Sequence, residues 1–390
     1  MIRGRTVLAL GISQLVCWGI SYYLIGGFGA RMAADFGWSR GVIYGGFSLA
    51  LLVMGMASPV IGRLIDRQGG RYVMSVGSVI TAVGCAALAF SYDLLTYYAS
   101  WICLGLAMRM TLYDAAFAVL ARAAGSGARR SMSQITLLGG LASTVFWPLG
   151  EWLAAMFGWR DAVLIYAGIA LMTVPLHMAM PHDSDERGEA PAPPPFVPRL
   201  TGRAATRAAV LFALSTTLAQ FLNAGMSSHM IAILAGLGVA EATAVWISTF
   251  RGVGQSASRL TELLFGGGLS APTLNVIAAV LLVGAFTAGF FSADFLLAAL
   301  AFAFAYGAGN GLMTITRGTL PLAMFDHRTY GSLVGRLLAP SFVVAATAPT
   351  VYATVIDRWG NRAALGMSLT IATATLLAAV AMRQPVRRTE

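Results

Sequence analysis

The chain has 390 residues, of which 57% are hydrophobic and only 11% are charged. Soluble domains carry about 25% charged residues, so a soluble protein of this size could not cover its surface with polar groups. The composition excludes a soluble enzyme and a disordered chain, and it predicts a polytopic membrane protein in contact with a lipid bilayer. All 26 basic residues are arginines scattered along the chain, a pattern that does not favour nucleic-acid binding.

Hydrophobic runs long enough to cross a bilayer recur along the whole chain. They lie at 7–30, 41–62, 72–91, 95–121, 131–156, 162–180, 207–235, 241–264, 272–292, 295–323, 331–355 and 363–382. The first run is too long, and too polar at its far end, for a cleaved signal peptide. The sequence therefore predicts an all-α fold with twelve transmembrane helices.

One segment interrupts this series. Residues 181–206 hold 6 of the 14 prolines and a cluster of acidic residues, a composition that cannot form a packed core. We therefore expect an N-terminal six-helix bundle over 1–180, a linker over 181–206 in water, and a C-terminal six-helix bundle over 207–390.

The arginines predict the topology. If the N-terminus is cytoplasmic, the termini and the loops on that side carry 16 arginines, and the opposite side carries five. Those five are Arg31, Arg40, Arg160, Arg358 and Arg362. This bias follows the positive-inside rule, so we expect a multi-pass protein of a bacterial-type inner membrane with both termini in the cytoplasm.

The two halves show signs of an internal repeat. Pro148 is followed by Arg160 after a Gly-Trp pair, and Pro349 is followed by Arg362 after a Trp-Gly pair. The corresponding positions are about 201 to 203 residues apart. Two repeats of six helices around a linker are typical of transporters, in which one half rocks against the other.

The loop after the second run carries a recognisable motif. It reads Gly62-Arg63-Leu64-Ile65-Asp66-Arg67-Gln68-Gly69-Gly70-Arg71, and it resembles the loop signature of the major facilitator superfamily in Gly62, Asp66, Arg67, Gly69 and Arg71. The resemblance implies two six-helix bundles whose first and fourth helices line a central cavity. It also implies that Asp66 belongs to a cytoplasmic latch. We further expect a monomeric protein without a bound cofactor.

Within that superfamily, the segment Phe36-Gly37-Trp38-Ser39-Arg40 resembles bacterial members of the monocarboxylate-porter group. Arg259 after Ser258 is a second point of resemblance. It lies in the eighth hydrophobic run (span eight, 241–264), where monocarboxylate carriers place an arginine for the substrate carboxylate. The lysine that many of those carriers have on span one has no counterpart, because the chain contains no lysine.

Span eight carries a polar stripe. Arg251, Gln255, Ser258, Arg259 and Glu262 fall within an arc of about 100° on an α-helix, and such a stripe cannot face lipid. An arginine fork matches a carboxylate, so Arg251 and Arg259 are candidate substrate-binding residues. The alternative is that Arg259 and Glu262 form an i,i+3 ion pair in the interface between the halves.

Spans four and ten place charges at corresponding positions of the repeat. Asp114 corresponds to Arg317, so the two could form an ion pair across the cavity that responds to protons or substrate. The alternative is a local pair such as Asp114 with Arg109. We expect Asp114, Arg317 and Glu262 to serve proton coupling or gating.

Other polar residues occur at helical spacing on the spans expected to line the cavity. The additional candidates for substrate binding are Gln14, Tyr22, Asn223, Tyr306 and Asn310. Such residues are also common between packed helices, where they join one helix to another.

These features predict a secondary transporter that moves a small organic anion, a monocarboxylate-like solute, together with protons. An efflux carrier for amphipathic or cationic compounds, using Asp114 and Glu151, is the alternative. An enzyme is not expected, since four scattered histidines and three isolated cysteines supply no metal or nucleophile cluster.

Overall fold

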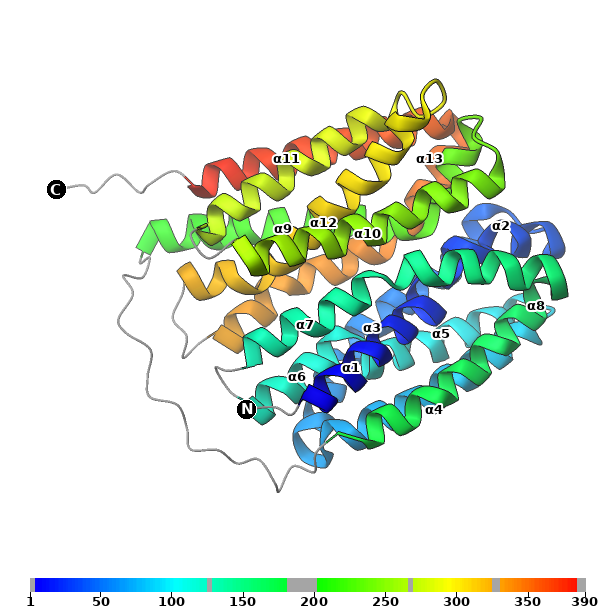
Figure 1. Ribbon diagram of the computed structural model, residues 1–390, viewed down its shortest axis with the longest axis horizontal. Coiled ribbons are helices and arrows are strands. Elements are labelled where there is room, and N and C mark those ends of the chain that lie inside the picture. The colour runs from blue at the N-terminus through cyan, green and yellow to red at the C-terminus, as the bar shows by residue number, and fades with distance from the viewer. Residues whose placement is uncertain (1–3, 125–127, 181–201, 266–268, 325–329, 384–390) are drawn as a thin grey trace.

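The computed structural model describes residues 4–124, 128–180, 202–265, 269–324 and 330–383, and the described residues form long helices packed side by side (Figure 1). The helices of the first half are α1 (Gly4–Cys17), the π-helix η1 (Trp18–Tyr22), α2 (Leu24–Phe36), α3 (Arg40–Gln68), α4 (Gly70–Ala89), α5 (Leu94–Thr111), α6 (Tyr113–Ala124), α7 (Ala128–Gly140) and α8 (Ala142–Met178). Those of the second half are α9 (Gly202–Gly236), α10 (Glu241–Phe265), α11 (Ala271–Gly289), α12 (Leu296–Met324) and α13 (Tyr330–Arg383).

These helices are consistent with the twelve expected spans. In the part of the chain that the structure describes, nine helical segments are long and apolar enough to cross a membrane. The segments Ser131–Met178 and Pro340–Arg383 each join two helices across a kink at Gly158 or Gly360. Helix α10 is not among the nine, because its polar stripe lowers its hydropathy.

The kinks also confirm the internal repeat. Gly158 (φ 83°) and Gly360 (φ 82°) adopt the same left-handed backbone 202 residues apart, close to the offset read from the sequence. Two further pairs at an offset of 201 contact each other: Asn223 Nδ2 donates to the Tyr22 hydroxyl over 3.3 Å, and Gly26 packs against the Ser227 carbonyl. Equivalent turns of the two halves therefore meet at the centre of the molecule, as a pseudo-twofold axis requires.

The molecule has two distinct ends. The described chain begins at Gly4, resumes at Gly202 and stops at Arg383 on one end, which we call the terminal side (left in Figure 1). The turns at Gly37 and Gly158 lie at the opposite end, the distal side (right in Figure 1).

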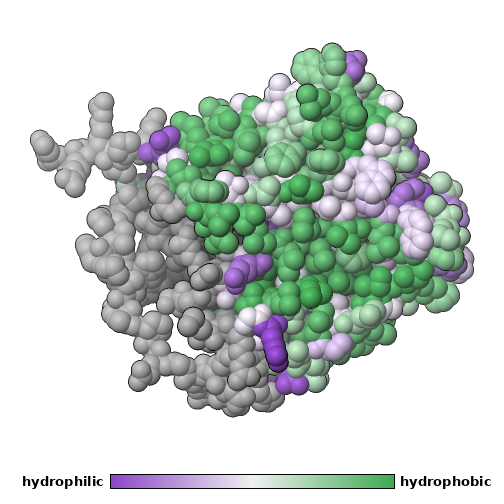
Figure 2. All heavy atoms as spheres, in the orientation of Figure 1, coloured by the Kyte–Doolittle hydropathy of each residue, from purple (hydrophilic) through white to green (hydrophobic). Residues whose placement is uncertain are grey.

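Between these ends the surface is apolar. The visible face is covered by hydrophobic side chains, and most hydrophilic residues gather near the two ends (Figure 2). Exposed side chains in the middle of helices include Val83 of α4 at 56% and Val280 of α11 at 52% exposure. A surface of this kind is stable against lipid and not against water.

Candidate functional site

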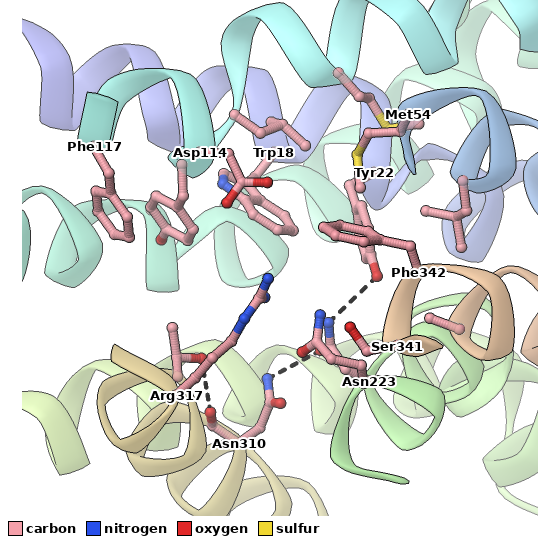
Figure 3. Close-up of a pocket in the computed structure, with 18 of the residues that line it drawn as sticks. Trp18, Tyr22, Met54, Asp114, Phe117, Asn223, Asn310, Arg317, Ser341 and Phe342 are labelled. Atoms are coloured by element: carbon pink, nitrogen blue, oxygen red, sulfur yellow. Dashed lines mark hydrogen bonds between the residues drawn. The ribbon is translucent and has the colours of Figure 1, made fainter. Parts of the chain in front are cut away.

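A cavity of about 270 Å³ lies between the two halves. Its wall comes from both halves, and Figure 3 shows side chains of η1, α3 and α6 facing side chains of α9, α12 and α13. The residues that line it are Trp18, Tyr22, Tyr23, Leu51, Met54, Met108, Leu112, Tyr113, Asp114, Phe117, Gly139, Gln220, Asn223, Gln255, Arg259, Asn310, Thr314, Arg317, Gly318, Leu338, Ser341, Phe342 and Ala345. Spans one, four, seven and ten all contribute, as expected, and spans two, five, eight and eleven complete the wall.

Interrupted helices shape the first half of this wall. Span one changes from α-helix to π-helix at Trp18–Tyr22, and span four breaks at Leu112, whose ψ of −175° is extended. Span five is interrupted at Leu141, between α7 and α8. Non-helical backbone at membrane depth is tolerated where it lines a cavity, and π-turns occur frequently at functional sites.

Arg259 brings a cation into the cavity wall. Its side chain is 3% exposed, and its Nη1 donates to the carbonyl oxygen of Thr136 on α7 of the other half. Its guanidinium carbon lies 6.0 Å from the Tyr113 ring centroid. Its Nε and Nη2 are buried without a hydrogen-bond partner among the described residues. The ion pair with Glu262, which was the alternative, is not found among the described residues, so the i,i+3 interpretation is not supported.

Arg251 lies behind the cavity wall and is fully buried. Its Nη2 donates to Asn223 Oδ1 and to Ser227 Oγ, both over 2.8 Å. Its guanidinium carbon lies 5.1 Å from the Tyr23 ring centroid and 5.2 Å from that of Tyr306. Its Nε and Nη1 have no partner in the described part of the chain, so two of the three guanidinium nitrogens are unused.

Asp114 is paired locally and not across the cavity. Its Oδ2 lies 2.7 Å from Nη1 of Arg109, across the break at Leu112. Arg317 extends from α12 into the cavity toward Asp114, and its guanidinium carbon lies 6.0 Å from the Phe342 ring centroid (Figure 3). The expected Asp114–Arg317 ion pair is therefore not formed in this structure, and the local alternative is the one observed.

An amide network crosses the cavity. Asn223 accepts a hydrogen bond from Asn310 over 3.0 Å and donates to Tyr22 over 3.3 Å (Figure 3). Since Asn223 also accepts from Arg251, this side chain connects the cavity surface to the buried arginine. Tyr22, Asn223 and Asn310 are thus placed where a substrate-binding role requires them.

Other candidates lie outside the lining. Gln14 is buried and donates from Nε2 to the Thr111 carbonyl over 2.8 Å, so it satisfies the broken end of α5. Tyr306 is buried, and its hydroxyl donates to the Leu222 carbonyl over 3.1 Å. Glu262 lies one turn beyond Arg259, also outside the lining.

The loop motif lies at the terminal side, away from the cavity. Gly69 ends α3 with a φ of 83°, and its amide donates to the Ile65 carbonyl. Gly62, Arg67 and Arg71 flank this turn on α3 and α4. The side chain of Asp66 lies outside the described part of the structure, so its latch role stays a prediction.

At the distal side the two halves are in contact. Arg40 Nε lies 3.5 Å from Asp357 Oδ1, and the Ser48 and Thr350 hydroxyls are 2.8 Å apart. The His229 ring is buried, with its centroid 4.0 Å from that of Tyr44. These contacts, which the sequence did not predict, close the cavity toward the distal side.

The sequence of this chain matches the family model of the Major Facilitator Superfamily over residues 10–337. The chain belongs to this superfamily. The assignment confirms the resemblance seen in the loop motif, and it agrees with the helical fold and the two related halves.

Curated relatives are monocarboxylate transporters. The chain is 33% identical to monocarboxylate transporter 11 of Homo sapiens over 202 residues, a match that covers 48% of this chain and 39% of that protein. It is 30% identical to monocarboxylate transporter 13 of Bos taurus over 129 residues, covering 33% of this chain and 30% of that protein. The matches therefore span less than half of the length of these relatives.

Solved structures share the fold. A crystal structure of a mutant of the nucleoside transporter NupG superposes with a TM-score of 0.70 at 15% identity, covering 97% of this chain and 98% of that one. A bacterial homologue of the human lysosomal transporter Spinster, in an inward-facing and occupied conformation, superposes with a TM-score of 0.63 at 15% identity, covering 96% and 92%. At this identity the likeness shows the fold alone.

Proposed function

We propose that this member of the superfamily is a secondary transporter that carries a small organic anion by alternating access. The observation that carries the proposal is the charge of the cavity wall. Arg259 and Arg317 line it without an acidic partner among the described residues, and Asp114, the acid in the lining, is paired with Arg109. Unpaired cations in a low-dielectric site are costly, so a bound anion would stabilise this arrangement.

Arg259 is the first candidate for the anion. Its free Nε and Nη2 form one edge of the guanidinium, which can bind both oxygens of a carboxylate. Its third nitrogen, Nη1, holds the Thr136 carbonyl of the other half. An anion on Arg259 would therefore sit at the interface that must open and close during transport.

Arg251 is the second candidate. It is fully buried, and it reaches the cavity surface only through Asn223. An anion could reach its unused Nε and Nη1 only after the halves move. Arg259 lines the cavity and Arg251 does not, so we assign Arg259 to the first binding step and Arg251 to a later, occluded step.

Proton coupling is part of the proposal, and Asp114 is the acid best placed for it. Its side chain is 40% exposed, it lines the cavity, and it faces Arg317 in Figure 3. Protonation of Asp114 would free Arg109, and so change the charge of the cavity by one unit. Glu262 lies outside the lining and is the weaker candidate.

The two acids that the cation-efflux alternative names are both paired with arginines. That alternative requires Asp114 and Glu151 to attract a cation, but Asp114 pairs with Arg109, and Glu151 accepts two hydrogen bonds of 2.7 Å from Arg31. We also propose that the terminal side is cytoplasmic, on the basis of the arginine distribution.

Transport by purified protein in proteoliposomes tests the proposal. Arg259→Gln should reduce uptake of small carboxylates at least tenfold, because a charged hydrogen bond to the anion is lost. Arg203→Gln is the matched control, since Arg203 is exposed at the start of α9 and its loss should leave uptake unchanged. Carboxylate uptake that is unaffected by Arg259→Gln would refute the assignment.

A further inference from the structure

The cavity holds more positive charge than one carboxylate can neutralise. Three charged side chains line it, namely Arg259, Arg317 and Asp114. Arg109 lies 2.7 Å from Asp114 and offsets its charge. In the described part of the chain, two guanidinium groups therefore remain without an acid.

The two free arginines approach the same turn of the first half. Arg259 of α10 stacks near Tyr113, with 6.0 Å between its guanidinium carbon and the ring centroid. Arg317 of α12 points toward Asp114, the next residue of the chain, across the cavity in Figure 3. One small ligand bound against the start of α6 can therefore contact both cations.

We propose that the transported anion carries two negative charges, one for Arg259 and one for Arg317. This inference rests on the proposed function and narrows its substrate class. A monocarboxylate on either arginine would leave the other cation unpaired in a site of low dielectric. A dianion neutralises both and leaves the Arg109–Asp114 pair in place.

The rest of the wall fits a short ligand. At about 270 Å³ the cavity lies below the range of about 300–1,000 Å³ typical of pockets for drug-sized molecules. Asn223 and Asn310 offer amide groups, and Trp18 and Phe342 offer apolar surface for a short carbon chain (Figure 3). The chemistry is that of a small dicarboxylate or a phosphate monoester.

Binding to detergent-purified protein separates these classes. Calorimetric titrations at pH 7.5 and constant ionic strength would compare succinate, glycerol phosphate and butyrate. Succinate matches butyrate in chain length but adds a second carboxylate, and glycerol phosphate places two charges on one group. We expect one or both dianions to bind at least tenfold more tightly than butyrate, since the second charge gains its own charged hydrogen bonds.

Variants assign the second charge to Arg317. Arg317→Gln should weaken dianion binding about tenfold or more and change butyrate binding by less than threefold, and Arg317→Lys should retain the preference for dianions. Arg203→Gln should leave all three affinities unchanged. A general defect in folding would lower the fraction of protein that binds, which the calorimetric stoichiometry reports, and would not remove the preference for dianions.

The outcomes are distinct. If wild-type protein binds butyrate as tightly as both dianions, or if Arg317→Gln lowers all three affinities equally, the dianion inference is wrong while anion transport stands. If none of the three anions binds, the proposed function fails together with the inference.

Discussion

At the scale of single residues, Arg251 is a buried cation that is costly to the fold. It is a fully buried cation, with hydrogen bonds from one nitrogen and aromatic rings around it, and no described acid pairs with it. A side chain that only stabilised the fold would carry a partner for its charge. The free-energy cost of burying the Arg251 charge therefore points to a role in binding or in conformational change.

Replacing Arg251 should separate stability from function. Arg251→Met removes the buried charge, and no polar neighbour loses its last partner, since Asn223 Oδ1 still accepts from Asn310 and Ser227 still donates to the Asn223 carbonyl. We expect an unchanged or raised Tm and transport reduced at least tenfold. The measurements are thermal unfolding in detergent and uptake in proteoliposomes. A Tm that falls by more than about 5 °C would show that Arg251 has a structural role instead.

The local pairing of Asp114 shows a limit of sequence reasoning at this scale. On a continuous helix, positions 109 and 114 point about 140° apart, so their side chains cannot meet. The break at Leu112 turns them toward each other. No proline or glycine marks that break, and the sequence therefore could not favour Arg109 over Arg317.

At the scale of elements, the broken end of α5 depends on a residue that was expected in the substrate site. Gln14 donates to the Thr111 carbonyl, which lies in the last turn of the helix. Gln14→Leu should leave that carbonyl unpaired in the interior and cost about 1–3 kcal/mol. Thermal unfolding should show a Tm lowered by several degrees, and the folded fraction should bind anions within about twofold of wild type. An unchanged Tm together with lost anion binding would show that Gln14 belongs to the substrate-binding site.

The turn between the two helices of α8 depends on its glycine. Gly158 has a φ of 83°, and nothing lies within 4 Å of the position where a Cβ would be, so Gly158→Ala strains only the backbone. With a ψ of 162°, this backbone lies in a region that is essentially confined to glycine, so we expect a cost of about 1–3 kcal/mol in unfolding free energy. Gly168 of the same helix is the control. It has equal open space and no positive φ, so Gly168→Ala should stabilise by about 0.5–1 kcal/mol. Equal effects of the two substitutions would contradict this account.

At the scale of the whole molecule, hydropathy predicted the architecture well, because lipid imposes long apolar helices and short loops. The repeat was visible in the Pro148 and Pro349 segments and is confirmed by the kinks at Gly158 and Gly360. The expectation that the polar stripe of α10 avoids lipid also holds for Gln255 and Arg259, which line the cavity.

Contacts between the halves were not predictable in the same way. Arg40 with Asp357 and Ser48 with Thr350 join residues about 300 positions apart, and each residue alone has the character of a loop or a helix surface. Their pairing depends on how the two bundles lean toward each other. It belongs to one conformation of the protein and is not encoded in any local pattern.

Those contacts lead to a test of alternating access. The Ser48 and Thr350 hydroxyl oxygens are 2.8 Å apart, so cysteines at both positions lie within reach of a disulfide. Oxidation of a Ser48→Cys, Thr350→Cys double variant should hold the distal side closed and reduce the transport rate to less than a tenth of that of the reduced variant. A reductant should restore transport. Each single variant serves as a control for the native thiols Cys17, Cys85 and Cys103. Full transport by protein shown to be cross-linked would mean that the distal contacts do not separate during the cycle, and that substrate moves by a route other than rocking of the two halves.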